Sequence, residues 1–233
     1  MAGKSFEPLK NLEKRILPSV VTFKADWRKV IKEVDKFGLS TISLFVTATT
    51  YHERQKIYKE LVKTKIKTIP HIHINQDMQE SEMDFLVKHY KAECFSVHYQ
   101  FLSNFKRSKY FKKMFVETNE FESRIKSRRL LAATGGICVD LSHMDTYIAK
   151  DKNYYYYCLR LARQYYVGCN HLSAGQVDGI APHVVKHLSD FDYLLKLPSY
   201  CFSKYICFEL TNSIAQQLQF KQYLVKLLSV RHK

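Results

Sequence analysis

The sequence predicts an α/β protein in which strand–helix units close into a single (β/α)₈ barrel, the TIM barrel. Short runs rich in β-branched and aromatic residues alternate with longer amphipathic runs, which is typical of a parallel sheet with crossover helices. Eight such units occur in 233 residues, a length at which α/β barrels commonly form one domain. No linker rich in Pro, Gly or Ser divides the chain, so we expect one domain over residues 1–233.

Each unit consists of an apolar run and the segment that follows it. The expected strands lie at residues 19–23, 41–46, 69–74, 94–99, 113–118, 137–142, 167–172 and 205–210. The expected helices lie at residues 26–37 and 51–63, from about 81, shortly after 99, and at 121–133, 154–166, 190–197 and 214–228. Gly38 ends the first helix and Ser81 is the expected cap of the third. An open doubly wound sheet is the alternative, but no Gly-rich phosphate loop follows the first strand.

Composition limits the class of protein. The first 15 residues lack the apolar core of a signal peptide, and no run approaches the roughly 18 apolar residues of a membrane span. The six cysteines include no C-x-x-C pair, which argues against a zinc knuckle and indicates reduced thiols. We therefore expect a soluble, cytoplasmic protein with no membrane contact, whose oligomeric state the sequence leaves open.

The formal net charge of +15 allows two interpretations. A dense basic stretch follows the fourth expected strand: Lys106, Arg107, Lys109, Lys112, Lys113, Arg124, Lys126, Arg128 and Arg129. Such runs usually solvate a helix face, which is the interpretation we favour. A nucleic-acid footprint, or attraction for phosphorylated substrates, is the alternative.

The alternation of side chains along the strands predicts which ones face the barrel axis. At residues 206–209, Ile206 and Phe208 share one parity while Cys207 and Glu209 share the other, and the same split recurs at 94–98 and 137–140. We expect the large apolar side chains to face the helices and the small ones to face the axis. Four cysteines are then interior fillers: Cys94, Cys138, Cys169 and Cys207.

Polar side chains of the inward parity stand at the carboxyl ends of the strands, where barrel enzymes build their sites. They are His73, His98, Glu117, Asp140, His171 and Glu209. Carboxylates gathered in one small space repel one another unless a positive charge joins them, and Asp, Glu and His are the usual ligands of divalent cations. We therefore predict a metal site formed by Glu117, Asp140, His171 and Glu209. His71 lies one layer deeper and is interpreted as structural.

Four motifs resemble those of the xylose-isomerase-like barrel superfamily, which includes sugar phosphate isomerases and epimerases and metal-dependent abasic-site endonucleases. The motifs are VETNEF from residue 116, GICVDLSHMD from 136, CNHLSAGQVDG from 169 and ICFELTN from 206. The resemblance covers residues 69–220, and the first two strands carry only the fold pattern. It implies a metal held by Glu117, Asp140, His171 and Glu209, with His143 beside it.

The isomerase and epimerase branch implies a divalent-metal-dependent enzyme acting on a sugar or sugar phosphate, with one Mn, Mg, Co or Zn ion. A cation on a carbonyl and a neighbouring hydroxyl spreads the charge of an enediolate, so that carboxylates can move the proton beside it. Glu117 and Glu209 would then be both ligands and proton carriers. His143 would contact substrate oxygens, and we assign His73 and His98 to substrate binding as well.

The endonuclease branch is the principal alternative, and a barrel that binds metal without turnover is a third. Histidines on the third and fourth strands of the nucleases match His73 and His98, although the Asp-x-His pair expected after the seventh strand finds only Asp178 and the more distant His183. The isomerase pattern also has departures. Thr118 separates Glu117 from Asn119, and Ala174 stands where an aspartate is common. Nucleic acid is thus a less favoured partner than a small sugar.

Overall fold

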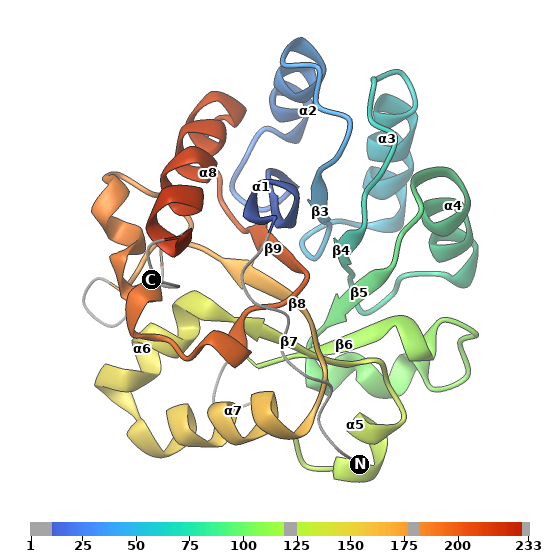
Figure 1. The fold of residues 1–233 in the computed structure, drawn as a ribbon. Coiled ribbons are helices and arrows are strands. Elements are labelled where there is room, and N and C mark those ends of the chain that lie inside the picture. Colours follow the sequence, from blue (N-terminus) through green and yellow to red (C-terminus); the bar gives the residue numbers. More distant parts are fainter. Residues whose placement is uncertain (1–10, 119–124, 177–181, 230–233) are drawn as a thin grey trace.

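The computed structural model describes residues 11–118, 125–176 and 182–229. Its parallel strands form one nine-stranded sheet in the order β1-β9-β8-β7-β6-β5-β4-β3-β2, which curls into a nearly closed barrel surrounded by helices (Figure 1). The strands are β1 (Ile16–Leu17), β2 (Ser19–Val21), β3 (Ser43–Phe45), β4 (His71–His73), β5 (Cys94–Val97), β6 (Met114–Glu117), β7 (Gly136–Asp140), β8 (Val167–Leu172) and β9 (Tyr205–Phe208). The predicted α/β barrel is therefore confirmed.

Pro18 explains why nine strands occur where eight were predicted. It separates β1, which pairs with β9, from β2, which pairs with β3, so these two short strands together close the sheet. Proline has no backbone N–H to donate to the ladder. Its carbonyl still accepts a hydrogen bond from Ser43 N at 2.8 Å, which carries the pairing across the interruption.

Helices cover the outside of the barrel, and the helical segments after β5 and β8 are of the 3₁₀ type. The α-helices are α1 (Leu12–Arg15), α2 (Trp27–Lys36), α3 (Tyr51–Leu61), α4 (Glu80–Tyr90), α5 (Arg128–Ala132), α6 (Leu141–Lys150), α7 (Lys152–Gln164) and α8 (Ile214–Ser229). The 3₁₀ segments are η1 (Tyr99–Phe105), η2 (Phe111–Lys113), η4 (Leu188–Lys196) and η5 (Ser199–Cys201). No helix in these described ranges is long and apolar enough to cross a bilayer.

Three of the expected helices differ in the structure. The segments after β5 and β8 form 3₁₀ turns rather than α-helices. The helix predicted at 121–133 is reduced, in its described part, to α5. Ser81 is not the cap of α4, because the N-cap is Gln79, two residues earlier, which forms a reciprocal capping box with Glu82, and Ser81 lies inside the helix.

The barrel interior is a separate apolar cluster from the layer between sheet and helices. It contains Leu17, Val21, Phe45, Cys94, Phe115, Cys138, Cys169, Tyr205 and Cys207. The four predicted cysteines do lie inside, but Phe45 and Phe115 show that large rings also face the axis. Gly168 makes room for one of them, since a Cβ at that position would lie 2.1 Å from the Phe115 ring. Small residues on one strand therefore offset aromatic rings on others.

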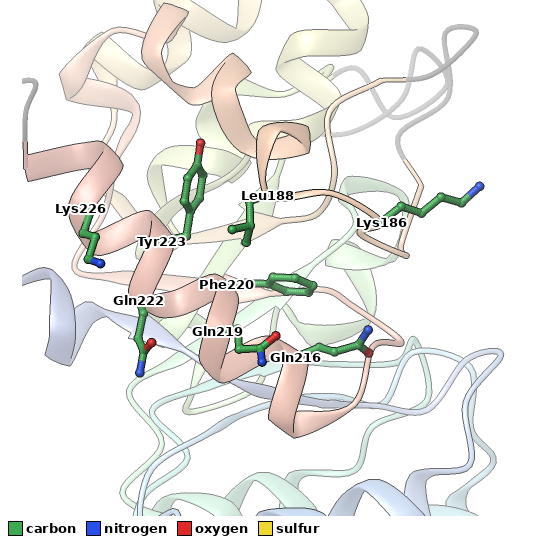
Figure 2. Close-up of a pocket in the computed structure, with 8 residues that line it drawn as sticks. All are labelled: Lys186, Leu188, Gln216, Gln219, Phe220, Gln222, Tyr223 and Lys226. Atoms are coloured by element: carbon green, nitrogen blue, oxygen red, sulfur yellow. The ribbon is translucent and has the colours of Figure 1, made fainter.

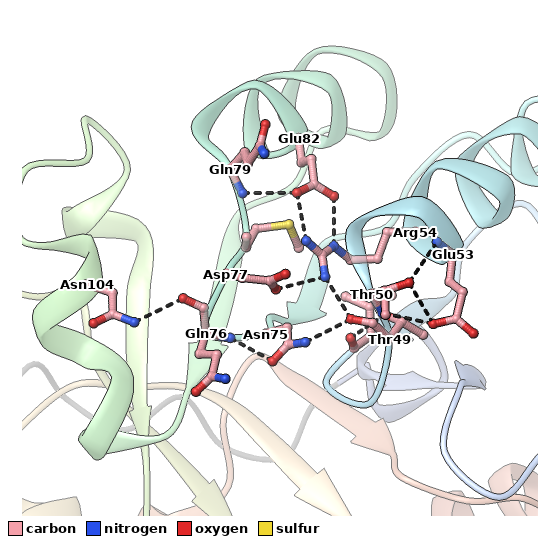
Figure 3. Close-up of polar contacts among 12 residues, drawn as sticks. Thr49, Thr50, Glu53, Arg54, Asn75, Gln76, Asp77, Gln79, Glu82 and Asn104 are labelled. Carbon is pink, nitrogen blue, oxygen red and sulfur yellow. Dashed lines mark hydrogen bonds and ion pairs between the residues drawn. The ribbon is translucent and has the colours of Figure 1, made fainter.

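Buried Arg54, at the start of α3, joins the loops that follow β3 and β4 (Figure 3). Its Nε and one terminal nitrogen donate to the two carboxylate oxygens of Glu82 at 2.8 and 3.0 Å. Its other terminal nitrogen donates to Thr49 O at 2.8 Å and to Asp77 at 2.9 Å. All three guanidinium nitrogens thus have acceptors, and this network fixes two loops on the rim that carries the candidate site.

Candidate metal centre at the barrel mouth

The carboxyl ends of β4 to β9 bring the predicted polar residues to one rim of the barrel. The register pairs Asp140 with His171, His171 with Cys207, and Glu117 with Cys138, so these side chains start at neighbouring levels. His73, Glu117, Asp140 and His171 are each at most 2% exposed, and Glu209 is 7% exposed. Parity along parallel strands therefore correctly placed these residues together.

Glu117 lies among three histidines at the end of β6. Its Oε1 is 3.2 Å from His171 Nδ1, and its Oε2 is 3.3 Å from His73 Nε2 and 3.2 Å from His98 Nε2. These distances allow electrostatic attraction, but Oε2 has no partner with hydrogen-bond geometry in the described part of the chain. Glu117 thus has unused acceptor capacity although it is buried.

Asp140 caps the helix that follows its strand. Its Oδ1 accepts hydrogen bonds from His143 N at 2.9 Å and from Ser142 Oγ at 2.7 Å, so part of its charge is met by the N-terminus of α6. Its Oδ2 is 3.7 Å from His143 Nε2. One carboxylate oxygen is therefore fixed by its own helix, while the other lies beside the His143 ring.

His171 joins the two glutamates. Its Nδ1 lies 3.2 Å from Glu117 and 3.6 Å from Glu209 Oε2, and its Nε2 bonds to Ser96 Oγ at 3.0 Å. A histidine that ligates a metal through one nitrogen usually engages a fixed partner through the other. The Ser96 contact therefore orients the ring so that Nδ1 faces the carboxylates.

The candidate ligands form two overlapping groups rather than the single set of four that the sequence predicted. One group is His73, Glu117 and His171, and the other is Asp140, His171 and Glu209, with the potential ligand atoms of each within 4.8 Å of one another. Glu117 belongs to the first group because its Oε2 lies beside His73 and His98. His73, predicted to bind substrate, is buried among atoms that could hold an ion.

The donor set fits a divalent cation. Both ring nitrogens of His73, Nδ1 of His171 and Oε2 of Glu117 are buried without hydrogen-bond partners among the described residues. Unpartnered buried polar atoms cost free energy unless something binds them. Imidazole and carboxylate together suit zinc, manganese or cobalt, so either group could hold such an ion.

The two glutamates differ in proton affinity. Burial alone would raise the pKa of Glu117, but His171, His73 and His98 outweigh burial and hold that pKa well below its usual value. Burial raises the pKa of Glu209 well above its usual value, and Glu117 and Asp140 add to this while His171 opposes it. Burial would lower the pKa of His171, yet the adjacent carboxylates raise it to about 10. Without an ion, a proton on His171 therefore supplies the compensating charge.

Three partly exposed histidines surround the buried cluster. His98 and His143 have 29% and 22% of their side chains exposed, which leaves surface for contact with a ligand. His183 engages Glu209 O through Nδ1 at 3.0 Å and packs edge-on against Phe23, and burial lowers its pKa. The structure thus places His183 at the mouth, although its sequence spacing did not match the expected pair.

Sequence reasoning missed the hydroxyl groups behind the candidate ligands. Ser173 Oγ donates to Ser142 Oγ at 2.8 Å, and Ser142 in turn donates to Asp140. Ser96 bridges His171 to His71, whose Nε2 lies 2.8 Å from the serine oxygen. The only sequence signal for Ser96 was its inward parity on β5. Asn119 and Asp178, which the sequence analysis compared with the family motifs, lie outside the described residues.

A surface groove of about 420 Å³ lies beside α8 (Figure 2). Its walls are Lys186, Leu188, Gln216, Gln219, Phe220, Gln222, Tyr223 and Lys226. These eight residues include no carboxylate, imidazole or thiol. The groove therefore does not compete with the barrel mouth as a site of acid–base or metal chemistry.

The fold and the mouth define a parallel α/β barrel with buried groups that could bind metal. No family model matches the chain, and no curated protein sequence matches it significantly. The site is therefore interpreted from its own geometry and chemistry.

Proposed function

We propose that the protein is a divalent-metal-dependent isomerase or epimerase of a sugar or sugar phosphate. One observation carries the proposal: Glu117 and Glu209 both approach His171 Nδ1, yet their environments move their pKa values in opposite directions. Carboxyl groups separated in this way are suited to act as a base and an acid in one site. Isomerisation beside a carbonyl requires such a pair.

Each residue would have a defined task. Glu117, held ionised by its histidines, would accept the proton from the carbon beside the carbonyl. Glu209, which holds its proton, would return one to the substrate. Asp140 and His171 would hold the cation, which when bound would polarise the carbonyl and the adjacent hydroxyl. His98 and His143 at the rim would donate hydrogen bonds to substrate oxygens, and the net charge of +15 would attract a phosphorylated sugar.

The test is exchange of substrate protons with solvent. Protein loaded with Mn²⁺ is incubated in D₂O with aldoses, ketoses and their phosphates, and deuterium incorporation beside the carbonyl is measured by NMR. We expect incorporation with at least one sugar, its loss in Glu117→Gln and Glu209→Gln, and normal rates in the surface control Glu60→Gln. Absence of incorporation throughout the panel, in protein that retains its metal, would contradict the proposal.

A second candidate, a metal-dependent phosphodiesterase acting on abasic DNA, is favoured by the two further histidines beside Glu117 Oε2, His73 at 3.3 Å and His98 at 3.2 Å, which could serve a second ion. Paired ions can hold the attacking and leaving oxygens of a phosphodiester, and a strongly basic chain is attracted to the backbone. Incubation with a duplex that contains one abasic site separates the two functions. Cleavage that depends on added zinc and is lost in His73→Asn would favour the nuclease, whereas an intact duplex together with sugar exchange would favour the isomerase.

A further inference from the structure

A second cluster of potential ligands lies inside the barrel, one layer below the mouth. It consists of His71, Cys138 and Cys169, all fully buried, with potential ligand atoms within 4.8 Å of one another. The pairing register places Cys138 directly beside Cys169 on β7 and β8. The cluster is formed by strands rather than loops, so its position is fixed by the barrel itself.

His71 presents one ring nitrogen that has no assigned task. Its Nε2 bonds to Ser96 Oγ at 2.8 Å, whereas its Nδ1 is buried without a hydrogen-bond partner among the described residues. A buried imidazole nitrogen without a partner costs free energy. Nδ1 is therefore the atom that remains for binding, and the serine on Nε2 is the kind of fixed partner that a metal-ligating histidine has.

We propose that His71, Cys138 and Cys169 bind a structural zinc ion in the interior of the barrel. Zinc is typically bound by thiolate and imidazole ligands, with Zn–S distances near 2.3 Å. One Zn²⁺ with two thiolates and a neutral imidazole carries no net charge, which suits a dry interior. A Cu⁺ ion with the same ligands would leave one uncompensated negative charge there, which is costly to bury.

Binding of zinc requires the three ligand atoms to move only slightly closer together. Two sulfurs on a tetrahedral zinc lie about 3.8 Å apart, given the usual Zn–S length. Ligand atoms within 4.8 Å reach this arrangement by moving about 1 Å or less. Cys94 and Cys207 lie in the same interior cluster, so the surroundings of these three ligands are otherwise apolar.

The location determines how the ion behaves. Residues that are fully buried inside a packed barrel offer a chelator no path, so the ion enters during folding and is released only on unfolding. At the mouth, the partly exposed side chains of His98 and His143 give a chelator access, so an ion bound there should be removed by dialysis. Resistance to chelation therefore separates the interior zinc from an ion at the mouth, and the inference does not depend on the proposed function.

The test measures metal that survives chelation of the folded protein. Protein produced with zinc is dialysed against EDTA, and the remaining metal is measured by mass spectrometry before and after unfolding in guanidinium. We expect about one zinc per chain, retained when folded and released on unfolding. Cys138→Ser and Cys169→Ser should lose it, whereas Cys158→Ser, a buried thiol on α7, should keep it.

A second measurement identifies the ligands in the wild-type chain, so the test does not depend on variants that fold poorly. Protein produced with cobalt in place of zinc should show thiolate-to-cobalt charge-transfer absorption in the near ultraviolet. The double variant Asp140→Asn, Glu209→Gln should keep both this band and the resistant ion, because it changes only the mouth. Wild-type protein that is free of metal after dialysis, or that lacks the cobalt band, would overturn the proposal.

Discussion

Two clusters of buried charge lie on the same rim of the barrel and differ in how completely their polar atoms are paired. In the Arg54 cluster, the guanidinium meets Glu82 through two parallel hydrogen bonds and has further acceptors in Thr49 O and Asp77 (Figure 3). At the mouth, Glu117 Oε2 and His171 Nδ1 have no hydrogen-bond partners among the described residues. Burial of charge is common to both clusters.

The contrast separates a structural role from a candidate functional one. A buried ion pair whose partners are complete needs nothing further, and its effect is to hold two loops together. A buried carboxylate with spare acceptor capacity can bind a cation or a ligand donor. A candidate functional site is therefore indicated by buried polar atoms without hydrogen-bond partners, and not by buried charge alone. Four measurements test this difference between the two clusters.

The largest expected effect is on the Arg54 cluster. Arg54→Met should lower the free energy of unfolding by about 3–5 kcal/mol, because it leaves the Glu82 carboxylate buried without its partner. Urea denaturation measures the change. Lys56→Met, at an exposed position of the same helix, should change stability by less than about 0.5 kcal/mol. Equal effects of the two changes would show that the network contributes no special stability.

A substitution at the mouth should reduce metal binding and leave stability almost unchanged. Asp140→Asn should weaken binding of Mn²⁺ or Zn²⁺ by more than the roughly 10–100-fold that changes behind metal ligands cause. The stability of the chelated protein should change little, since the amide can still accept the bond from His143 N. Calorimetric titration with the metal and urea denaturation in EDTA measure the two effects. A large loss of stability with intact metal binding would show that Asp140 has a structural role and is not a metal ligand.

Removal of the hydroxyl behind Asp140 should have a smaller effect. Ser142→Ala deletes a donor to Asp140 and an acceptor for Ser173, so metal affinity should fall by about 10–100-fold. The matched control is Ser108→Ala, which lies away from the mouth. Indistinguishable affinities for the two variants would mean that α6 alone fixes the Asp140 carboxylate.

The smallest expected effect is on pH dependence. In chelated protein, Glu117 and Glu209 raise the pKa of His171 to about 10, against an ordinary value of 6.5. Between pH 7 and 9 the folded chain therefore holds a proton that the unfolded chain lacks, and stability should fall with rising pH by up to about 1.4 kcal/mol per unit. Urea denaturation at several pH values measures the slope, which His171→Asn should flatten. Stability that rises over this range would contradict the assigned charge.

The alternation of side chains along the strands allowed much of the site to be predicted. Asp140 and His171 were placed together because both belong to the inward parity at the ends of strands that pair directly. The Arg54 cluster could not be predicted in the same way. An arginine in an amphipathic helix usually faces solvent, and only the packing of α3 against the β4 loop buries it.

The sequence alone determined the alternating strands and helices, the parallel barrel and the set of inward polar residues, because a two-residue period is a local property of the chain. Tertiary structure decided which of those residues lie together as groups of potential metal ligands. Glu117 turns toward His73 and His98, His171 is shared by two groups, and His71 meets two cysteines one layer below. These distances join residues that are 19 to 98 positions apart in sequence, and they depend on the tilt and register of the closed barrel.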